Sequence, residues 1–368
     1  MNVTPPIKQR GFSITEMLVA AVIGLILTAG AISMLVTSKQ TYVVQDDLAR
    51  IQEGARFAMD LMLADIRAAG YFGCHNSMGN VTNNLNGAAN GVLFDTARAI
   101  EALEDGVDAW APSNNTTDRV ITTLDGGALG DTLRGSDAIT IRRAGGIRWP
   151  ATANMNNLGD PVTINHAPIN GVSINTGDLL VLSDCASADI FRATNTPPAS
   201  AAAAINHNAG ANPEDNATNL LNKRYDTTAF VSPLATVRYF IGRDATGGPA
   251  NPSLFREIVA NGVITTQELV PGVESMQITY GIDNTGDNIP DSYVAANAGA
   301  LGMVANNWNA VEAVRVALLL RSEQANSPDL DRSTYLVNGQ ALFGGAAPND
   351  NRRRRVMMSA IFMRNNTQ

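Results

Sequence analysis

Residues 8–20 of the chain read Lys-Gln-Arg-Gly-Phe-Ser-Ile-Thr-Glu-Met-Leu-Val-Ala. Lys8 and Arg10 belong to a short basic leader that ends at Gly11, and an apolar run follows it to about residue 36. That run is long enough to cross a bilayer as a helix, for which about 20 residues suffice. Glu16 is its only charged residue. A carboxylate in such a run costs on the order of 3 kcal/mol unless it has a partner, so the sequence marks Glu16 as functional.

The order of the leader and the apolar run differs from that of a secretory signal. A secretory signal places its small-residue cleavage site after the apolar core. Here the small residue, Gly11, precedes the core, so cleavage after it would remove the leader and keep the helix. Basic residues tend to stay in the cytoplasm, so we expect the chain beyond residue 36 to face outward. The alternative is an ordinary single-pass anchor whose Glu16 reaches the cytoplasmic interface.

Gly-Phe-Ser-Ile-Thr-Glu-Met after a basic leader closely resembles the class III signal of type IV pilins and type II secretion pseudopilins. The resemblance implies that a prepilin peptidase cuts between Gly11 and Phe12 and N-methylates Phe12. It also implies that Glu16 pairs with the N-terminal amine of a neighbouring subunit. In a low-dielectric bilayer or fibre core, the amine and the carboxylate would each stabilise the charge of the other.

Composition limits what the rest of the chain can do. The 368 residues carry a net charge of −8, and aromatic residues make up 5%. The length allows one large domain or two modest ones, and the acidic balance argues against a nucleic-acid binder. The sequence has no nucleophile elbow, no HExxH motif, no phosphate-binding glycine loop and no Cys/His metal knuckle, so we predict that it is not an enzyme.

The two cysteines, Cys74 and Cys185, allow a single disulfide. An exported location permits the bond, and one pair leaves no ambiguity of connectivity. It would close a loop of roughly 110 residues and stabilise the fold by about 4–5 kcal/mol in the chain-entropy model. Two buried free thiols are the alternative.

Residues 12–69 contain no proline and are dominated by helix formers. Beyond the membrane run, apolar residues recur at spacings of three and four over residues 44–66, which is the pattern of an amphipathic helix. We therefore expect one long helix, with residues 12–36 embedded in the membrane or fibre, residues 37–70 packed on a globular domain, and Gly70 as its stop. Asp65 and Arg67 cannot face each other on a helix, so separate partners are expected.

After Gly70 the pattern changes to short strands between turns, which predicts a β-rich outer domain over residues 71–368. The best candidates, rich in Val, Ile, Leu and aromatic residues, are 138–142, 178–183, 190–193, 236–242, 254–259, 264–270, 273–280, 311–320 and 356–363. Residues 255–268 should form a hairpin through Asn261-Gly262, whereas 76–90 and the insertion at 194–222 should be loops. A long helix followed by strands predicts a pilin-like α+β fold with an antiparallel sheet against the helix.

Residues 283–291 read Asp-Asn-Thr-Gly-Asp-Asn-Ile-Pro-Asp and resemble a dockerin- or EF-hand-type calcium loop. The candidate ligands of a Ca²⁺ ion, by their loop positions, are the side chains of Asp283, Thr285, Asp287 and Asp291 and the carbonyl of Ile289. Position 6 is Asn288 instead of Gly, and position 12 is Val294, so the bidentate Glu is missing and affinity should be weak. The alternative is a turn whose Asp and Asn residues are simply turn formers.

Arg352 to Arg355 form a basic run before the last predicted strand. Such a run can bind phosphate or anionic lipid. We favour a solvated strand edge that discourages edge-to-edge aggregation.

Further segments are similar to PilW-type minor pilins, namely residues 56–74, 235–291, 311–321 and 355–365. The resemblance implies a structural subunit of a type IV pilus, at its tip or in its initiation complex, that supports pilus assembly, twitching motility and adhesion. The implied partners are the prepilin peptidase, other minor pilins, the major pilin and a tip adhesin. The implied location is the inner membrane, single-pass with a cytoplasmic N-terminus, and then the pilus at the cell surface.

Two other functions fit the same N-terminal signal. A large minor pseudopilin of a type II secretion system shares it, and the resemblances at 56–74 and 268–281 favour the pilus. The second alternative is a membrane-tethered calcium-binding or adhesive module that never polymerises. Such a module would not need Glu16. Calcium is the one cofactor that the sequence suggests, and an anchored enzyme would need a clustered site that the sequence does not show.

Overall fold

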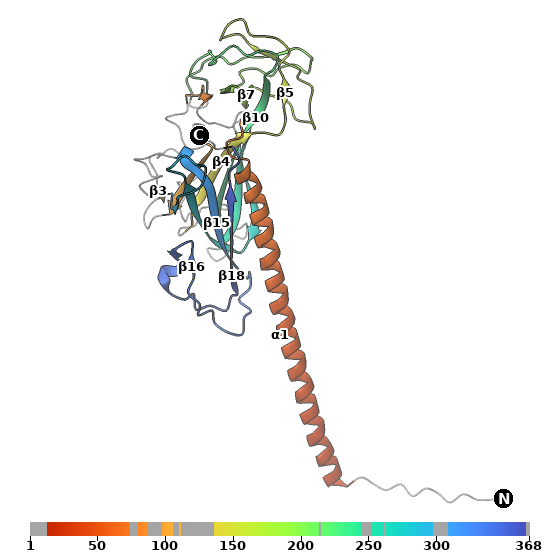
Figure 1. Cartoon of the computed structure of the whole chain (residues 1–368). Helices are drawn as coiled ribbons and strands as arrows, with labels where there is room; N and C mark the ends of the chain where they lie inside the picture. The colour runs from red at the N-terminus through yellow and green to blue at the C-terminus, as the bar shows by residue number, and fades with distance from the viewer. Residues whose placement is uncertain are drawn as a thin grey trace, which may run out of the picture.

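The computed structural model describes residues 13–73, 80–86, 98–105, 110–111, 136–212, 215–243, 252–260, 263–296 and 308–365. A long helix, α1 (Ile14–Arg67), carries a β-rich domain along its second half, while its first half projects away from that domain (Figure 1). This is the predicted α+β fold. The short 3₁₀ helices are η3 (Trp308–Ala310) and η4 (Leu342–Gly345).

The strands form two main sheets. The hydrogen-bonded order of the first is β1 (Val81–Asn83), β8 (Ala188–Arg192), β7 (Leu179–Ser183), β10 (Phe230–Arg243), β4 (Ala138–Ala144), β2 (Ile100–Asp105) and β3 (Trp110–Ala111). β5 (Trp149–Pro150) and β11 (Pro252–Ala260) also pair with β10, and β12 (Val263–Pro271) pairs with β11. The second sheet runs β14 (Ser292–Val294), β13 (Val273–Ile282), β15 (Val311–Arg321), β18 (Arg354–Phe362).

Two small antiparallel ladders complete the fold. They are β6 (Val162–Ile164) with β9 (Ala203–Ile205), and β16 (Leu336–Val337) with β17 (Gln340–Ala341). Pairing is antiparallel within the main sheets except between β1 and β8, which are parallel.

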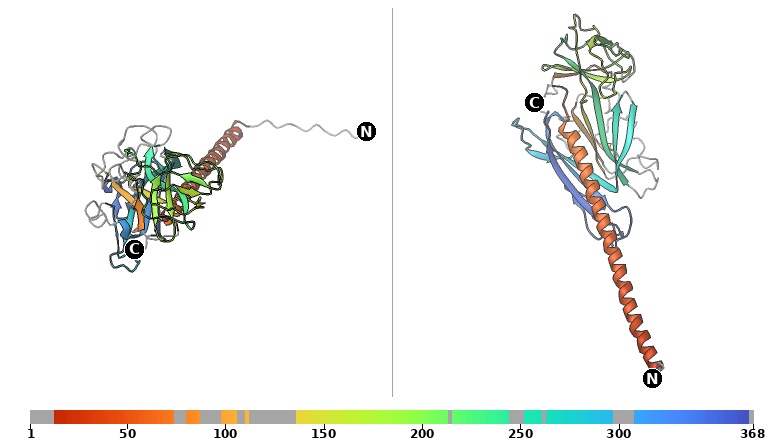
Figure 2. Two further views of the ribbon diagram at one scale, coloured as in Figure 1. Left: turned by 90° about the horizontal axis from the view of Figure 1, so that it is seen from above. Right: turned by 90° about the vertical axis from the view of Figure 1, so that its right-hand side faces the viewer.

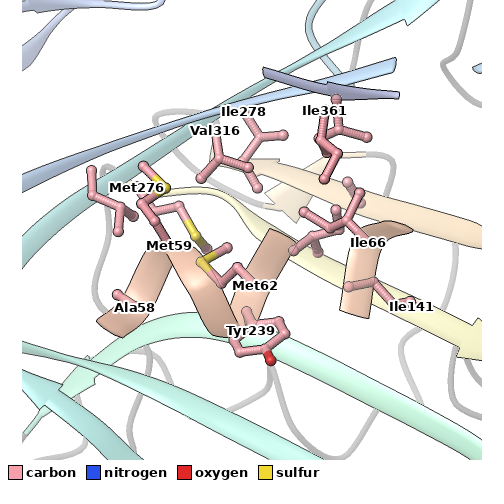
Figure 3. Close-up of a cluster of buried hydrophobic side chains, with 14 of the residues drawn as sticks. Ala58, Met59, Met62, Ile66, Ile141, Tyr239, Met276, Ile278, Val316 and Ile361 are labelled. Atoms are coloured by element: carbon pink, nitrogen blue, oxygen red, sulfur yellow. The ribbon is translucent and has the colours of Figure 1, made fainter. Parts of the chain in front are cut away.

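The core lies where α1 is held between the two sheets, as the right-hand view of Figure 2 shows. The helix contributes a buried stripe made of Ile51, Ala55, Ala58, Met59, Met62 and Ile66. In Figure 3, Met276, Ile278, Val316 and Ile361 of the second sheet lie on one side of the helix, with Ile141 and Tyr239 of the first sheet on the other. Because both flanks of the stripe are covered, the second half of α1 is fixed to the domain by apolar packing.

Two glycines allow close approaches that the core needs. Gly54 of α1 faces β12 so closely that a Cβ there would lie 2.9 Å from Cγ1 of Val270. Gly272 joins β12 of the first sheet to β13 of the second with φ +78°, and a Cβ there would lie 2.6 Å from the carbonyl oxygen of Arg321. Glycine tolerates that conformation at no steric cost, so Gly272 is the corner at which the chain changes sheets.

A second apolar core lies at the end of the domain opposite the N-terminus of α1 (Figure 1). We call the described residues of 149–231 around this core the distal head. It is centred on Trp149, Leu180, Leu182, Phe191 and Tyr225. β10 connects the two parts, since its residues Phe230 to Pro233 pair with β7 and its residues from Leu234 onward pair with β4.

All nine predicted strands are present. Seven of them are one to three residues longer than expected, β10 is seven residues longer, and β7 is one residue shorter. β11 and β12 form the predicted antiparallel hairpin, while Asn261 and Gly262 of its turn lie outside the described residues. The predicted loops are only partly irregular, because 194–222 contains β9 and 76–90 contains β1. Strands of two or three residues carry too little alternation to be recognised from sequence.

The expectation that Arg352 to Arg355 are a solvated strand edge was wrong for Arg354. β18 is an edge strand, but the Arg354 side chain is only 1% exposed and forms ion pairs with Glu274, Asp331 and Asp350. The pairing of β15 with β18 sets Arg354 opposite Arg321, and both arginines bind Glu274 of β13. Acidic side chains at distant positions therefore hold Arg354 inward, while Arg355 stays exposed.

Candidate functional site

The start of α1 is stabilised by a capping box. The Ser13 main-chain N–H donates to Oε2 of Glu16 at 3.0 Å, and the Ser13 Oγ accepts from the Thr15 N–H at 3.3 Å. Such reciprocal bonds satisfy amides that a helix start leaves unpaired, and an acid there also suits the helix dipole. Glu16 is thus hydrogen-bonded within its own chain. Gly11 and Phe12, where cleavage and methylation are predicted, lie outside the described residues.

The first half of α1 is an exposed apolar surface. Its large side chains are at least half exposed, from Ile14 at 80% to Val36 at 51%. Among the described residues, α1 is the one helix long and apolar enough to cross a membrane, and none of its apolar window is buried in the domain. Thr28, Thr37 and Thr41 each donate their hydroxyl to the carbonyl four residues earlier, so these polar groups are satisfied within the helix. The surface therefore suits lipid or other helices.

Asp65 joins the end of α1 to the first sheet. Its Oδ1 accepts from Nη2 of Arg143 (β4) at 3.0 Å, and its Oδ2 accepts from the Tyr239 hydroxyl (β10) at 2.6 Å and from Nη2 of Arg256 (β11) at 2.8 Å. Asp65 is 5% exposed, whereas Arg67 is exposed, so the two have separate surroundings as predicted. Burial first, and then the Asp65 charge, raise the pKa of Tyr239 well above its usual range.

The predicted disulfide between Cys74 and Cys185 stays a prediction, because Cys74 lies outside the described residues. Gly73, the residue before it, has φ +108° and packs so tightly on Ser183 that a Cβ there would collide with the serine side chain. Ser183 ends β7, two residues before Cys185. The backbone therefore places Gly73 beside the end of β7.

The loop at 283–291 is built from main-chain hydrogen bonds to its acids. Oδ1 of Asp283 accepts from the N–H groups of Thr285 (2.8 Å) and Gly286 (2.7 Å), and its Oδ2 accepts from the N–H of Asn288 (2.7 Å). Burial would raise the pKa of Asp283, but these amide bonds hold it below its usual value. Asn288 adopts φ +61°, the left-handed conformation that a glycine would take there.

The remaining candidate calcium ligands are partly engaged as well. Oδ1 of Asp287 accepts from the Ile289 N–H, and Oδ2 of Asp291 accepts from the Asn284 N–H. Within the described part of the chain, no group of three or more His, Cys, Asp or Glu side chains is placed to hold a metal ion. The donor set thus does not fit a preformed calcium site, and calcium binding there stays a hypothesis.

Two family models match the chain. The prokaryotic N-terminal methylation motif matches residues 7–32, and the type IV pilus-assembly protein W, PilW, matches residues 238–365. The chain is a PilW-like type IV pilin. These matches indicate a minor pilin of the type IV pilus, a structural and non-enzymatic class whose members are processed by a prepilin peptidase and assemble with other pilins.

Some of the candidate residues of this pilin lie within the two matched segments and others lie outside them. Gly11, Phe12 and Glu16 fall in the first match, and the 283–291 loop falls in the second, as do β11 to β15 and β18. Asp65 and the distal head lie outside both.

Comparisons with individual proteins add little. A type IV-like pilin from Thermus thermophilus aligns over 52% of this pilin and 86% of its own chain, with 13% identity and a TM-score of 0.23. At that score the likeness carries no weight in the assignment. No curated protein matches the chain.

Sequence reasoning missed the partners of Asp65. Asp65 occupies the buried stripe of α1 between Met62 and Ile66, and an acid on an apolar stripe signals a cationic partner. The sequence offered no means of choosing Arg143 and Arg256 among its other arginines.

Proposed function

We propose that this minor pilin is incorporated at the tip or in the initiation complex of a type IV pilus, where it supports pilus assembly, twitching motility and adhesion. The observation that carries the proposal is the exposed apolar half of α1 with Glu16 in its first turn. In water such an exposed apolar surface would be unfavourable. In a subunit that first lies in a membrane and then packs in a fibre, lipid and later neighbouring helices cover it.

The proposed location follows from the same segment. The basic leader keeps the N-terminus in the cytoplasm, and α1 crosses the inner membrane once with the β-rich domain outside. The prepilin peptidase cleaves between Gly11 and Phe12 and methylates Phe12. On assembly, Glu16 exchanges its bond with the Ser13 amide for the terminal amine of a neighbouring subunit, which would keep the carboxylate paired outside water.

The distal head supports a place at the end of the fibre. It lies beyond the end of α1 that is opposite to the N-terminus (Figure 1). When subunits stack along a fibre, the head would occupy the space where the next subunit's domain has to sit. The head would then be displayed at the tip, next to other minor pilins above the major pilin and in contact with a tip adhesin.

The test is incorporation of the full chain into pili. With an epitope tag after Asn365, wild-type chain should appear in sheared pili, and Glu16→Ala should remain in the membrane fraction. Asp60→Ala, which changes an exposed acid on the same helix, is the matched control and should be incorporated normally. Normal incorporation of Glu16→Ala would contradict a polymerising subunit and favour a tethered module.

A deletion strain separates the pilus from the secretion system. We expect loss of surface pili and twitching with unchanged secretion of enzymes. Lost secretion with normal piliation would show instead that the chain is a pseudopilin.

A further inference from the structure

A groove of about 690 Å³ runs beside α1 where the helix leaves the domain. One wall is α1 from Tyr42 to Phe57. The other is formed by the end of β12, by the last two residues of β15 and by residues 322–324 and 326 after it. These helix residues span about four turns, or roughly 22 Å. The helix wall presents Tyr42 and Phe57, which are 69% and 52% exposed. An aromatic pair so exposed at both ends of a groove marks an interaction surface.

The groove is more acidic than basic. Asp46, Asp47, Glu53 and Glu323 line it, against Arg50 and Arg321. Both arginines are already engaged, since Arg50 Nε bonds Asp46 at 2.9 Å and Arg321 Nη1 bonds Glu274 at 3.1 Å.

The four acidic side chains that line the groove outnumber its two basic ones and leave it negatively charged. Burial first, and then the neighbouring Asp46 charge, raise the pKa of Asp47, although Arg353 and Arg50 oppose this. Glu53 makes no ion pair with any described residue. A partner that brings positive charge would relieve both carboxylates.

The groove continues a surface that must itself be covered. The exposed apolar half of α1, up to Val36, leads directly to Tyr42 at the mouth of the groove. Whatever packs along the apolar half and continues outward therefore reaches the groove. A helix with an apolar first half and a polar second half would match both surfaces, the apolar half of α1 and the groove beyond it.

We propose that the groove holds the basic, amphipathic second half of an α-helix from a different pilin subunit, an inference that rests on the proposed function. Apolar side chains of that helix pack between Tyr42 and Phe57. Its Lys or Arg side chains pair with Asp47, Glu53 and Glu323.

A second copy of the same chain fits the groove poorly. Over residues 39–67, α1 carries four basic side chains (Lys39, Arg50, Arg56, Arg67) and five acidic ones (Asp46, Asp47, Glu53, Asp60, Asp65). A second copy would therefore bring no net positive charge to the carboxylates of the groove, which disfavours it as the occupant. This charge balance favours a heterotypic neighbour whose helix is basic.

Photo-crosslinking of the full chain in piliated cells tests the inference. With p-benzoylphenylalanine in place of Phe57, we expect an adduct to a peptide from the second half of another pilin's helix, rich in Lys or Arg. The double variant Asp47→Lys/Glu53→Lys should reduce the yield of that adduct about tenfold, because like charges then face each other. Asp60→Lys makes the same kind of charge reversal on α1 outside the groove and should leave the yield unchanged.

Four results would overturn the inference. They are an adduct to a second copy of this chain, an adduct to lipid alone, no adduct although the chain is present in sheared pili, and an equal loss in Asp47→Lys/Glu53→Lys and Asp60→Lys. Failure of the proposed function looks different: the adduct to a basic pilin helix would form while sheared pili lack the chain. That result would support the groove assignment and reject incorporation in the pilus.

Discussion

The carboxylate of Glu16 accepts a hydrogen bond from the main-chain N–H of Ser13, at 3.0 Å, in the first turn of the exposed apolar helix. The sequence showed an acid in a membrane-length run with no counter-ion, an arrangement that is costly. The capping box removes part of that cost, since the carboxylate and the amide satisfy each other before any neighbour is present. The subunit can thus wait in the membrane with Glu16 paired.

The Ser13–Glu16 bond separates two roles of one side chain. Glu16→Gln keeps an acceptor for the Ser13 amide and removes the charge, whereas Glu16→Ala removes both. We expect both variants to reach the membrane and neither to enter pili, with the Ala variant also losing about 1 kcal/mol of helix-start stability. Immunoblots of membrane and sheared-pilus fractions measure this. Incorporation of Glu16→Gln into pili at the wild-type level would show that assembly does not need the charge of Glu16.

Asp65 should be the acid whose removal costs most stability. Asp65→Ala leaves Arg143 and Arg256 without their shared carboxylate, and breaking a buried pair costs about 3–5 kcal/mol. Asp60→Ala, at an exposed position one and a half turns earlier, should change stability by no more than about 0.5 kcal/mol. Denaturant unfolding of the full chain in detergent compares the two. Equal effects would show that the Asp65 pairs contribute nothing net.

The Arg354 cluster should make the fold sensitive to acid. The hydrogen bond from Arg354 lowers the pKa of the Asp350 carboxyl. Burial by itself would raise the pKa of Asp331, but hydrogen bonds from Tyr335, Ser333 and Arg354 outweigh burial and lower it. A folded-state pKa below the unfolded value contributes stability that is present above the unfolded pKa, 3.8, and is lost as pH falls through the folded value. We therefore expect stability to fall below about pH 4.

The variant Arg354→Met tests that origin of the acid sensitivity. It should lower stability near pH 7 and flatten the loss below pH 4, as measured by unfolding at a series of pH values. An unchanged slope in the variant would place the acid sensitivity elsewhere.

Gly272 should resist substitution. Its φ of +78° and its approach to the Arg321 carbonyl leave no room for a Cβ, so Gly272→Ala should destabilise the chain by about 1–3 kcal/mol. Gly146→Ala is the control, since no neighbouring atom lies within 4 Å of a Cβ there. Thermal unfolding of the two variants decides, and equal midpoints would contradict the role of Gly272 as the corner between sheets.

Calcium binding at the 283–291 loop can be settled by calorimetry. An ion there would have to displace amide bonds from Asp283, so we expect at most weak binding at millimolar Ca²⁺. Heat that disappears in Asp287→Ala would support the calcium hypothesis. The same heat in Asp287→Ala and wild type, or none in either, would reject it.

The extent of sequence-based prediction differs between the two ends of the chain. The basic leader, the apolar run and Glu16 are features of contiguous residues. Because each can be recognised without knowledge of the fold, α1 and its membrane-length first half could be predicted. Most strands of five or more residues were predicted, although the six-residue β2 was missed. The strands β5, β6 and β9, which are two or three residues long, were missed as well. The Arg354 cluster was misjudged because its acids lie at positions 274, 331 and 350.

A long helix with an apolar first half, followed by strands, could be predicted from the amino-acid sequence alone, since helix length and hydropathy are properties of contiguous residues. The folded chain adds three features that this pattern does not contain. The helix α1 lies between two sheets, Asp65 pairs with Arg143 and Arg256, and an acidic groove opens beside Tyr42 and Phe57. The pair of Asp65 and Arg256, for example, joins residues 191 positions apart in the chain. Such pairings depend on strand register and sheet packing, which no local pattern encodes.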